Sequence, residues 1–143
     1  MQFEKVEDLK LWERADQFWV GVAKVLERPC IRRHRKLHEQ LSDAADSILS
    51  NISEGFEQPT DRAFAKYLYT AKASTAEVRN RRKLCCRRGY ISAEEFAAHD
   101  ALGDEIARIA NGLIKYLLAS DRRDRALGRK ATRRRAPTRE KCG

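Results

Sequence analysis

The sequence has few residues that interrupt helices and no long apolar run. Only three prolines and seven glycines occur in 143 residues, so long helices are expected. No apolar stretch approaches the roughly 20 residues that a membrane-spanning helix needs, which argues against any contact with a membrane. The first five residues also lack the charged start and apolar middle of a secretory signal. We therefore expect a cytoplasmic protein.

The sequence also lacks the motifs of common catalytic and metal sites. It has no Gly-rich phosphate loop, no Ser-His-Asp arrangement and no His-Glu-x-x-His run. His34 and His38 have the i, i+4 spacing of two metal ligands, but no Cys-x-x-Cys pair accompanies them and their neighbours are strongly cationic. The four cysteines show no regular framework and are expected to be free thiols. We predict a protein that is not an enzyme and has no catalytic residues, no metal and no cofactor.

The positive charge is concentrated near the C-terminus. The net charge is +9, and residues 121–143 hold ten of the 30 Lys and Arg but only three of the 21 acidic residues. Leu127 is the only large apolar residue there, so little burial could offset the entropy of ordering. We predict a folded domain over residues 1–120 and a disordered Arg-rich tail over 121–143. Within the tail, Arg133, Arg134 and Arg135 are candidate contacts to nucleic acid.

Apolar residues recur at steps of three and four in four segments, which predicts four amphipathic helices. They cover about residues 9–27, a second segment from His34 or Leu37 to Glu54, residues 61–88, and a last segment that opens at Ser92 and ends near residue 120. Asp8 and Thr60 are expected N-caps, and Ser92 with Glu95 forms a capping box. Short connections between such helices predict an all-α, antiparallel up-down-up-down four-helix bundle.

The apolar stripes predict which side chains form the core. In the second helix they are Leu37, Leu41, Ala44, Ala45, Ile48 and Ile52, and Gly55 ends the pattern. In the first helix they are Leu9, Trp12, Ala15, Trp19, Val22 and Leu26, and Phe18 and Val25 widen the apolar face. His99 falls on the stripe of the last helix and is expected to be a partly buried core residue. Gly21 weakens its helix by about 1 kcal/mol relative to Ala, unless close packing requires it.

Two runs of residues carry a family resemblance. The run Q-L-x-x-A-A-x-S-I-x-x-N-I-x-E-G extends from Gln40 to Gly55, and F-x-x-x-L-x-x-A-x-x-S-x-x-E extends from Phe64 to Glu77. In this order and spacing they resemble the 23S rRNA intervening-sequence protein family. The resemblance implies four-helix bundles that assemble as ring-like homopentamers without established enzymatic activity. It also implies an architecture similar to the accessory protein of diversity-generating retroelements, which binds nucleic acid and a reverse transcriptase.

The polar residues of these runs are candidates for a site. We weighed a metal or catalytic role for Asn51, Glu54 and Glu77, and favour a structural or subunit-interface role because polar groups near a helix end satisfy backbone and neighbouring donors. The family-motif residues expected to have such a role are Gln40, Ser47, Asn51, Glu54, Gly55, Ser74 and Glu77.

The predicted topology brings two basic segments to the same end of the bundle. The candidate nucleic-acid contacts there are Arg32, Arg33, Arg35, Lys36, Arg79, Arg81, Arg82, Lys83, Arg87 and Arg88. Lys and Arg release counterions from a nucleic acid and so supply affinity without sequence specificity. The leading prediction is a non-enzymatic oligomer that binds nucleic acid, with structured RNA favoured through the resemblance. The alternative is a protein–protein adaptor or scaffold with no direct nucleic-acid role, whose basic end is only a solvated surface.

Overall fold

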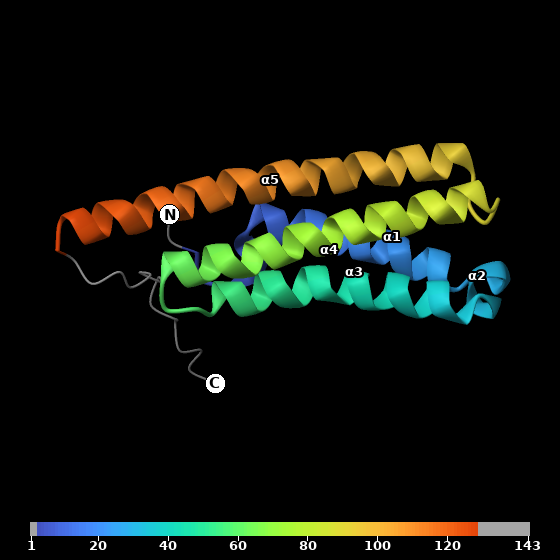
Figure 1. Ribbon diagram of the computed structural model, residues 1–143, viewed down its shortest axis with the longest axis horizontal. Coiled ribbons are helices and arrows are strands. Elements are labelled where there is room, and N and C mark those ends of the chain that lie inside the picture. The colour runs from blue at the N-terminus through green and yellow to red at the C-terminus, as the bar shows by residue number, and fades with distance from the viewer. Residues whose placement is uncertain (1–2, 129–143) are drawn as a thin grey trace, which may run out of the picture.

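The protein is a bundle of helices. Its computed structural model describes residues 3–128, and the predicted all-α fold is confirmed. Figure 1 shows the long helices side by side along one axis, with successive helices running in opposite directions. The elements are a 3-10 turn η1 (Val6–Asp8), α1 (Lys10–Leu26), a short α2 (Pro29–Arg33), α3 (Arg35–Phe56), α4 (Asp61–Arg87) and α5 (Ala93–Ala126).

The starts of α4 and α5 are capped as the sequence predicts. The hydroxyl of Thr60 accepts a hydrogen bond from the backbone N–H of Ala63 at 3.1 Å. The capping box of α5 is complete, since Ser92 Oγ accepts from the N–H of Glu95 at 3.1 Å and Glu95 Oε1 accepts from the N–H of Ser92 at 3.3 Å. Gly89 follows α4 with a φ of +75°, a conformation that glycine adopts without strain.

The start of α1 differs from the prediction. Asp8 does not cap α1, because it lies inside η1 and its carboxylate accepts from the N–H of Lys5 at 3.3 Å. Leu9 occupies the cap position instead, and its side chain is buried. The apolar anchor of Leu9 in the core therefore decides where α1 begins.

Helix α3 supplies the centre of the core, and all six of its predicted stripe residues are at most 4% exposed. Each large apolar side chain buried in this way contributes about 1.5–3 kcal/mol relative to exposure. Most of the apolar face predicted for α1 is buried, at Leu9, Ala15, Phe18, Val22 and Val25. Leu11 is buried as well, while Trp12 and Trp19 lie half-buried at the edge of the core.

Helix α5 is longer than predicted. It continues past Ser120 to Ala126, so the predicted helix end is wrong and residues 121–126 do not belong to a disordered tail. Asp121 is 5% exposed, and its Oδ2 forms an ion pair with Arg125 Nε at 3.1 Å. Arg123 and Arg125 also lie in the last turn, where cations interact favourably with the helix dipole. The remaining tail, including Arg133, Arg134 and Arg135, lies outside the described residues.

Within residues 3–128, no helix combines the length and apolar character needed to cross a membrane.

Candidate nucleic-acid interface

The α1–α3 and α4–α5 connections meet at one end of the bundle (Figure 1). Arg28 joins them: its Nη1 donates to the carbonyl oxygen of Tyr90 at 2.9 Å, and its Nη2 pairs with the Glu95 carboxylate. The His34 and Tyr90 rings meet edge to face with centroids 6.4 Å apart. These contacts place residues 28–36 beside the end of α4.

The side chains of seven predicted cations at this end are exposed. The sequence has no acidic residue between Glu27 and Glu39 and none between Glu77 and Glu94, so few carboxylates neutralise them. Arg87 and Arg88 lie at the C-terminus of α4. This surface, called the basic end below, consists of Arg32, Arg33, Arg35, Lys36, Lys83, Arg87 and Arg88.

Arg82 does not belong to this surface. It is 3% exposed because it continues the buried line of Val78 and Cys85 along α4. Its Nη2 donates weakly to the carbonyl oxygen of Glu95 at 3.4 Å, while Nε and Nη1 are buried without a hydrogen-bond partner among residues 3–128. Burial lowers the pKa of Arg82 from its ordinary value. The prediction that Arg82 contacts a phosphate therefore does not fit the structure.

Arg79 and Arg81 are held by carboxylates. Arg79 donates to both oxygens of Asp100, at 2.9 and 3.1 Å, and this bidentate hydrogen bond raises the pKa of Arg79. Its Nη1 is 3.9 Å from an oxygen of Asp104. Arg81 is half-buried, with Nη2 4.0 Å from Glu77. Arg79 fastens α4 to α5 and is not available as a phosphate contact in this arrangement.

Three residues of the family motif form a polar contact between α3 and α4. The hydroxyls of Ser47 and Ser74 are 2.7 Å apart, and Asn51 Nδ2 donates to the carbonyl oxygen and the hydroxyl of Ser47 at 2.8 and 3.0 Å. Glu54 and Glu77 are exposed and lie outside this cluster, and Gln40 is half-buried. The hydrogen bond between Ser47 and Ser74 joins α3 to α4 within the chain.

Gly55 lies at the closest approach of α3 and α4. A Cβ added there would be 2.7 Å from the Cβ of Tyr67 and 2.8 Å from Cδ2 of Phe64, closer than real side chains come. The family-motif glycine is therefore explained by the lack of room for a methyl group.

His34 and His99 have partners within the fold. His34 Nδ1 accepts from the N–H of Leu37 at 3.2 Å and so caps α3. His99 stacks on Phe18 with centroids 4.3 Å apart and donates from Nε2 to the Phe18 carbonyl oxygen at 2.9 Å. Burial lowers the pKa of His99 to about 4. No group of three or more His, Cys, Asp or Glu side chains in the described part of the chain is arranged to hold a metal ion.

His99 also explains Gly21. A Cβ at residue 21 would lie 2.2 Å from His99 Nε2, so close packing does require glycine there.

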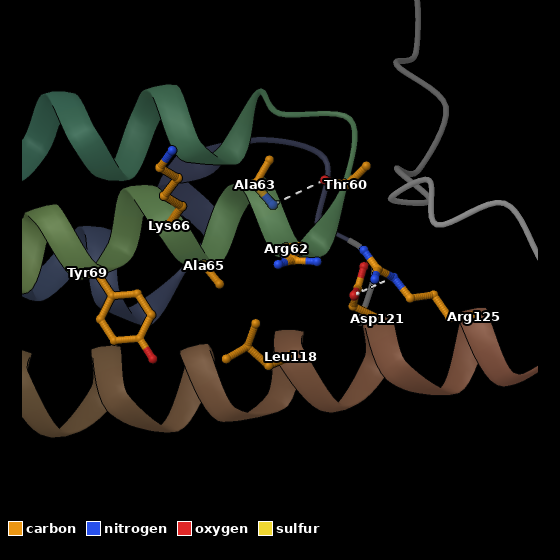
Figure 2. Close-up of a pocket in the computed structure, with 9 residues that line it drawn as sticks. All are labelled: Thr60, Arg62, Ala63, Ala65, Lys66, Tyr69, Leu118, Asp121 and Arg125. Atoms are coloured by element: carbon orange, nitrogen blue, oxygen red, sulfur yellow. Dashed lines mark hydrogen bonds and ion pairs between the residues drawn. The ribbon is translucent and has the colours of Figure 1, made fainter.

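A pocket at the opposite end of the bundle escaped the sequence-based prediction. It lies between the start of α4 and the end of α5 (Figure 2), and Asp121 is its buried acidic residue. The sequence places residue 121 in the tail because Leu127 is the only large apolar residue after Ser120. The i, i+4 spacing of Asp121 and Arg125 was the one available signal that the helix continues.

The fold and the basic end define a class of protein: an all-helical bundle whose exposed cations gather at one end. The chain belongs to the 23S rRNA-intervening sequence protein family, whose family model matches residues 7–112. The fold is similar to the crystal structure of a protein of unknown function from the S23 ribosomal protein family of Bacteroides thetaiotaomicron. That comparison has a TM-score of 0.66 and 20% identity, and covers 73% of this chain and 98% of the other. No curated protein matches the chain.

Proposed function

We propose that this protein is a non-enzymatic, oligomeric RNA-binding protein of the cytoplasm. The observation that carries the proposal is the basic end, where seven exposed cations from two connections share one surface. Such a surface binds phosphates by releasing counterions and needs no base-specific contact. Membership of a family named for an intervening sequence in 23S rRNA favours structured RNA as the ligand.

An oligomer would increase this affinity. We infer from the family resemblance that the chain forms a homo-oligomer, a pentamer by that resemblance, so that several copies of the basic end engage one RNA. Linked copies raise the effective concentration at each further contact. Size-exclusion chromatography with light scattering tests this inference: a mass equal to one 16.5 kDa chain would contradict it.

The RNA-binding proposal is tested by fluorescence anisotropy across a salt series. The double variant Arg87→Gln/Arg88→Gln removes two exposed cations of the basic end. Lys10→Gln/Lys115→Gln removes the same charge from exposed positions outside the basic end and is the matched control. We expect the slope of log affinity against log salt to fall by about two for the first variant, and to change little for the second.

A truncated chain separates the basic end from the tail. The truncation should end at residue 128 and not at 120, because α5 runs to Ala126 and buries Asp121. Binding by both chains with a steep salt slope supports the basic end. Binding by the full-length chain alone assigns the affinity to residues 129–143. Absence of binding at low salt overturns the proposal and favours the protein–protein adaptor.

A further inference from the structure

The pocket between α4 and α5 has the size of a small-molecule site. Its volume is about 440 Å³, and such sites commonly span about 300–1,000 Å³. Figure 2 shows Tyr69 toward one end of it, Asp121 with Arg125 toward the other, and Leu118 between them. Ala65 and Leu118 contribute an apolar wall between the two helices.

Asp121 brings a carboxylate to the wall of the pocket. The residue is 5% exposed, and its Oδ2 forms an ion pair with Arg125 Nε at 3.1 Å. Its Oδ1 is buried and has no hydrogen-bond partner among residues 3–128. A buried carboxylate oxygen without a donor is costly, so a ligand that brings N–H donors would be favoured here.

The other lining residues favour a ligand that is negatively charged and contains a flat ring. Three of them are exposed cations, Arg62, Lys66 and Arg125, against the single carboxylate of Asp121. A simple cation is therefore disfavoured, despite the free oxygen. Tyr69 is 54% exposed, and its ring offers an aromatic face for stacking.

We propose that this pocket binds one guanine nucleotide, either free or as an unpaired residue of an RNA. The adjacent N1–H and N2–H groups of guanine donate to Asp121, the base packs against Tyr69, and Arg62 with Lys66 balances the phosphate charge. Arg125 leaves Asp121 when the base enters. In this exchange the guanine N–H groups replace the Arg125 contact to the buried carboxylate, and the largely exposed Arg125 side chain turns to solvent. Only the RNA form of the ligand rests on the proposed function.

The pocket is separated from the basic end by the length of α4. At 1.5 Å per residue, the 27 residues of α4 span about 40 Å. Because of this separation, a variant in one place leaves the other unchanged, and the two proposals can fail independently.

The test is calorimetric titration of the full-length chain with the guanosine, adenosine, cytidine, uridine and inosine monophosphates. We expect one guanosine monophosphate per chain, and affinity about tenfold weaker for uridine monophosphate, which offers a single N–H donor. Inosine monophosphate lacks only the N2 amino group and should fall in between. Absence of binding by guanosine monophosphate, or equal binding of all five nucleotides, would overturn the proposal.

Asp121→Asn should lower the affinity for guanosine monophosphate about tenfold, because the amide has a donor in place of one acceptor oxygen. Asp124→Asn is the matched control, since Asp124 lies one turn further along α5 and does not line the pocket. Equal losses in both variants would contradict the assignment. If circular dichroism shows that Asp121→Asn does not fold, Tyr69→Ala, at an exposed position, tests the pocket instead. A Tyr69→Ala chain that binds guanosine monophosphate as tightly as the unaltered chain would refute the stacking role.

Anisotropy with two single-stranded RNAs, one with an unpaired guanine and one with uracil in its place, distinguishes the sources. Asp121→Asn should remove the preference for the RNA with guanine, whereas Arg87→Gln/Arg88→Gln should lower the affinity for both RNAs equally. Nucleotide binding without any RNA binding supports the pocket for free nucleotide and refutes the proposed function. RNA binding without nucleotide binding supports the proposed function and overturns the pocket.

Discussion

Replacing Gly55 with Ala should destabilise the bundle at the contact of α3 with α4. The new Cβ would be 2.7 Å from the Cβ of Tyr67, an atom fixed to the α4 backbone, so the helices must separate by several tenths of an ångström. Overpacking of this kind costs about 1–3 kcal/mol. The helix preference of Ala over Gly returns at most about 1 kcal/mol. We expect a net loss of about 1–2 kcal/mol in the free energy of unfolding.

Gly112→Ala is the matched control. Gly112 is an exposed residue of α5, and a Cβ there would meet no atom within 4 Å. Only the helix preference changes, so this variant should gain about 0.5–1 kcal/mol. The same substitution at the two sites is therefore expected to have opposite signs.

The assay is urea unfolding followed by circular dichroism, at one protein concentration because an oligomer makes stability depend on concentration. The midpoints of the two variants should lie on opposite sides of that of the unaltered protein, with unchanged slopes. A Gly55→Ala protein as stable as the unaltered chain would refute the reasoning, because it would mean that α3 and α4 are not packed as closely as described.

The buried polar groups give three further expectations. Ser74→Ala should cost about 0.5–1.5 kcal/mol in urea unfolding because the 2.7 Å bond to Ser47 is lost, whereas Ser50→Ala at an exposed hydroxyl should change little. Arg82→Met should leave the free energy of unfolding equal or higher, because it removes two buried, unpaired nitrogens. It should leave the RNA affinity measured by anisotropy unchanged, and a large loss of affinity would show that Arg82 contacts the RNA. His99 has a pKa of about 4 in the folded chain against an ordinary 6.5, so the unfolded chain binds the proton first and stability falls as pH drops from 6.5 toward 4. His99→Gln should flatten this part of the pH profile of the urea midpoint. An unchanged profile would mean that other groups cause the loss of stability at low pH.

Local side-chain chemistry explains why several parts of the fold were predictable. The stripe of α3 is apolar at every third or fourth residue from Leu37 to Ile52, and any helix with this pattern must bury that face. The hydroxyl caps at Thr60 and Ser92 depend only on residues within one turn. These features were confirmed because the residues that decide them are neighbours in sequence.

The features that were missed depend on partners distant in sequence. Arg82 is three residues from Arg79 and equally basic, but it falls on the buried line of α4 while Arg79 reaches Asp100. Asp121 appeared to belong to a polar tail, yet packing against the start of α4 buries it. Composition could not separate these cases, since burial depends on which neighbouring helix covers a side chain.

The sequence by itself determined that this chain forms four long helices, where most of them start, and that most of its uncompensated charge is basic. Periodicity, caps and net charge are properties of residues close together in the chain, so they can be read without a fold. The tertiary structure alone decided which cations remain on the surface, why Gly21 and Gly55 have no room for a methyl group, and that α5 closes a pocket with α4. Those outcomes are set by contacts between residues far apart in sequence, because only the packed bundle brings them within reach of one another.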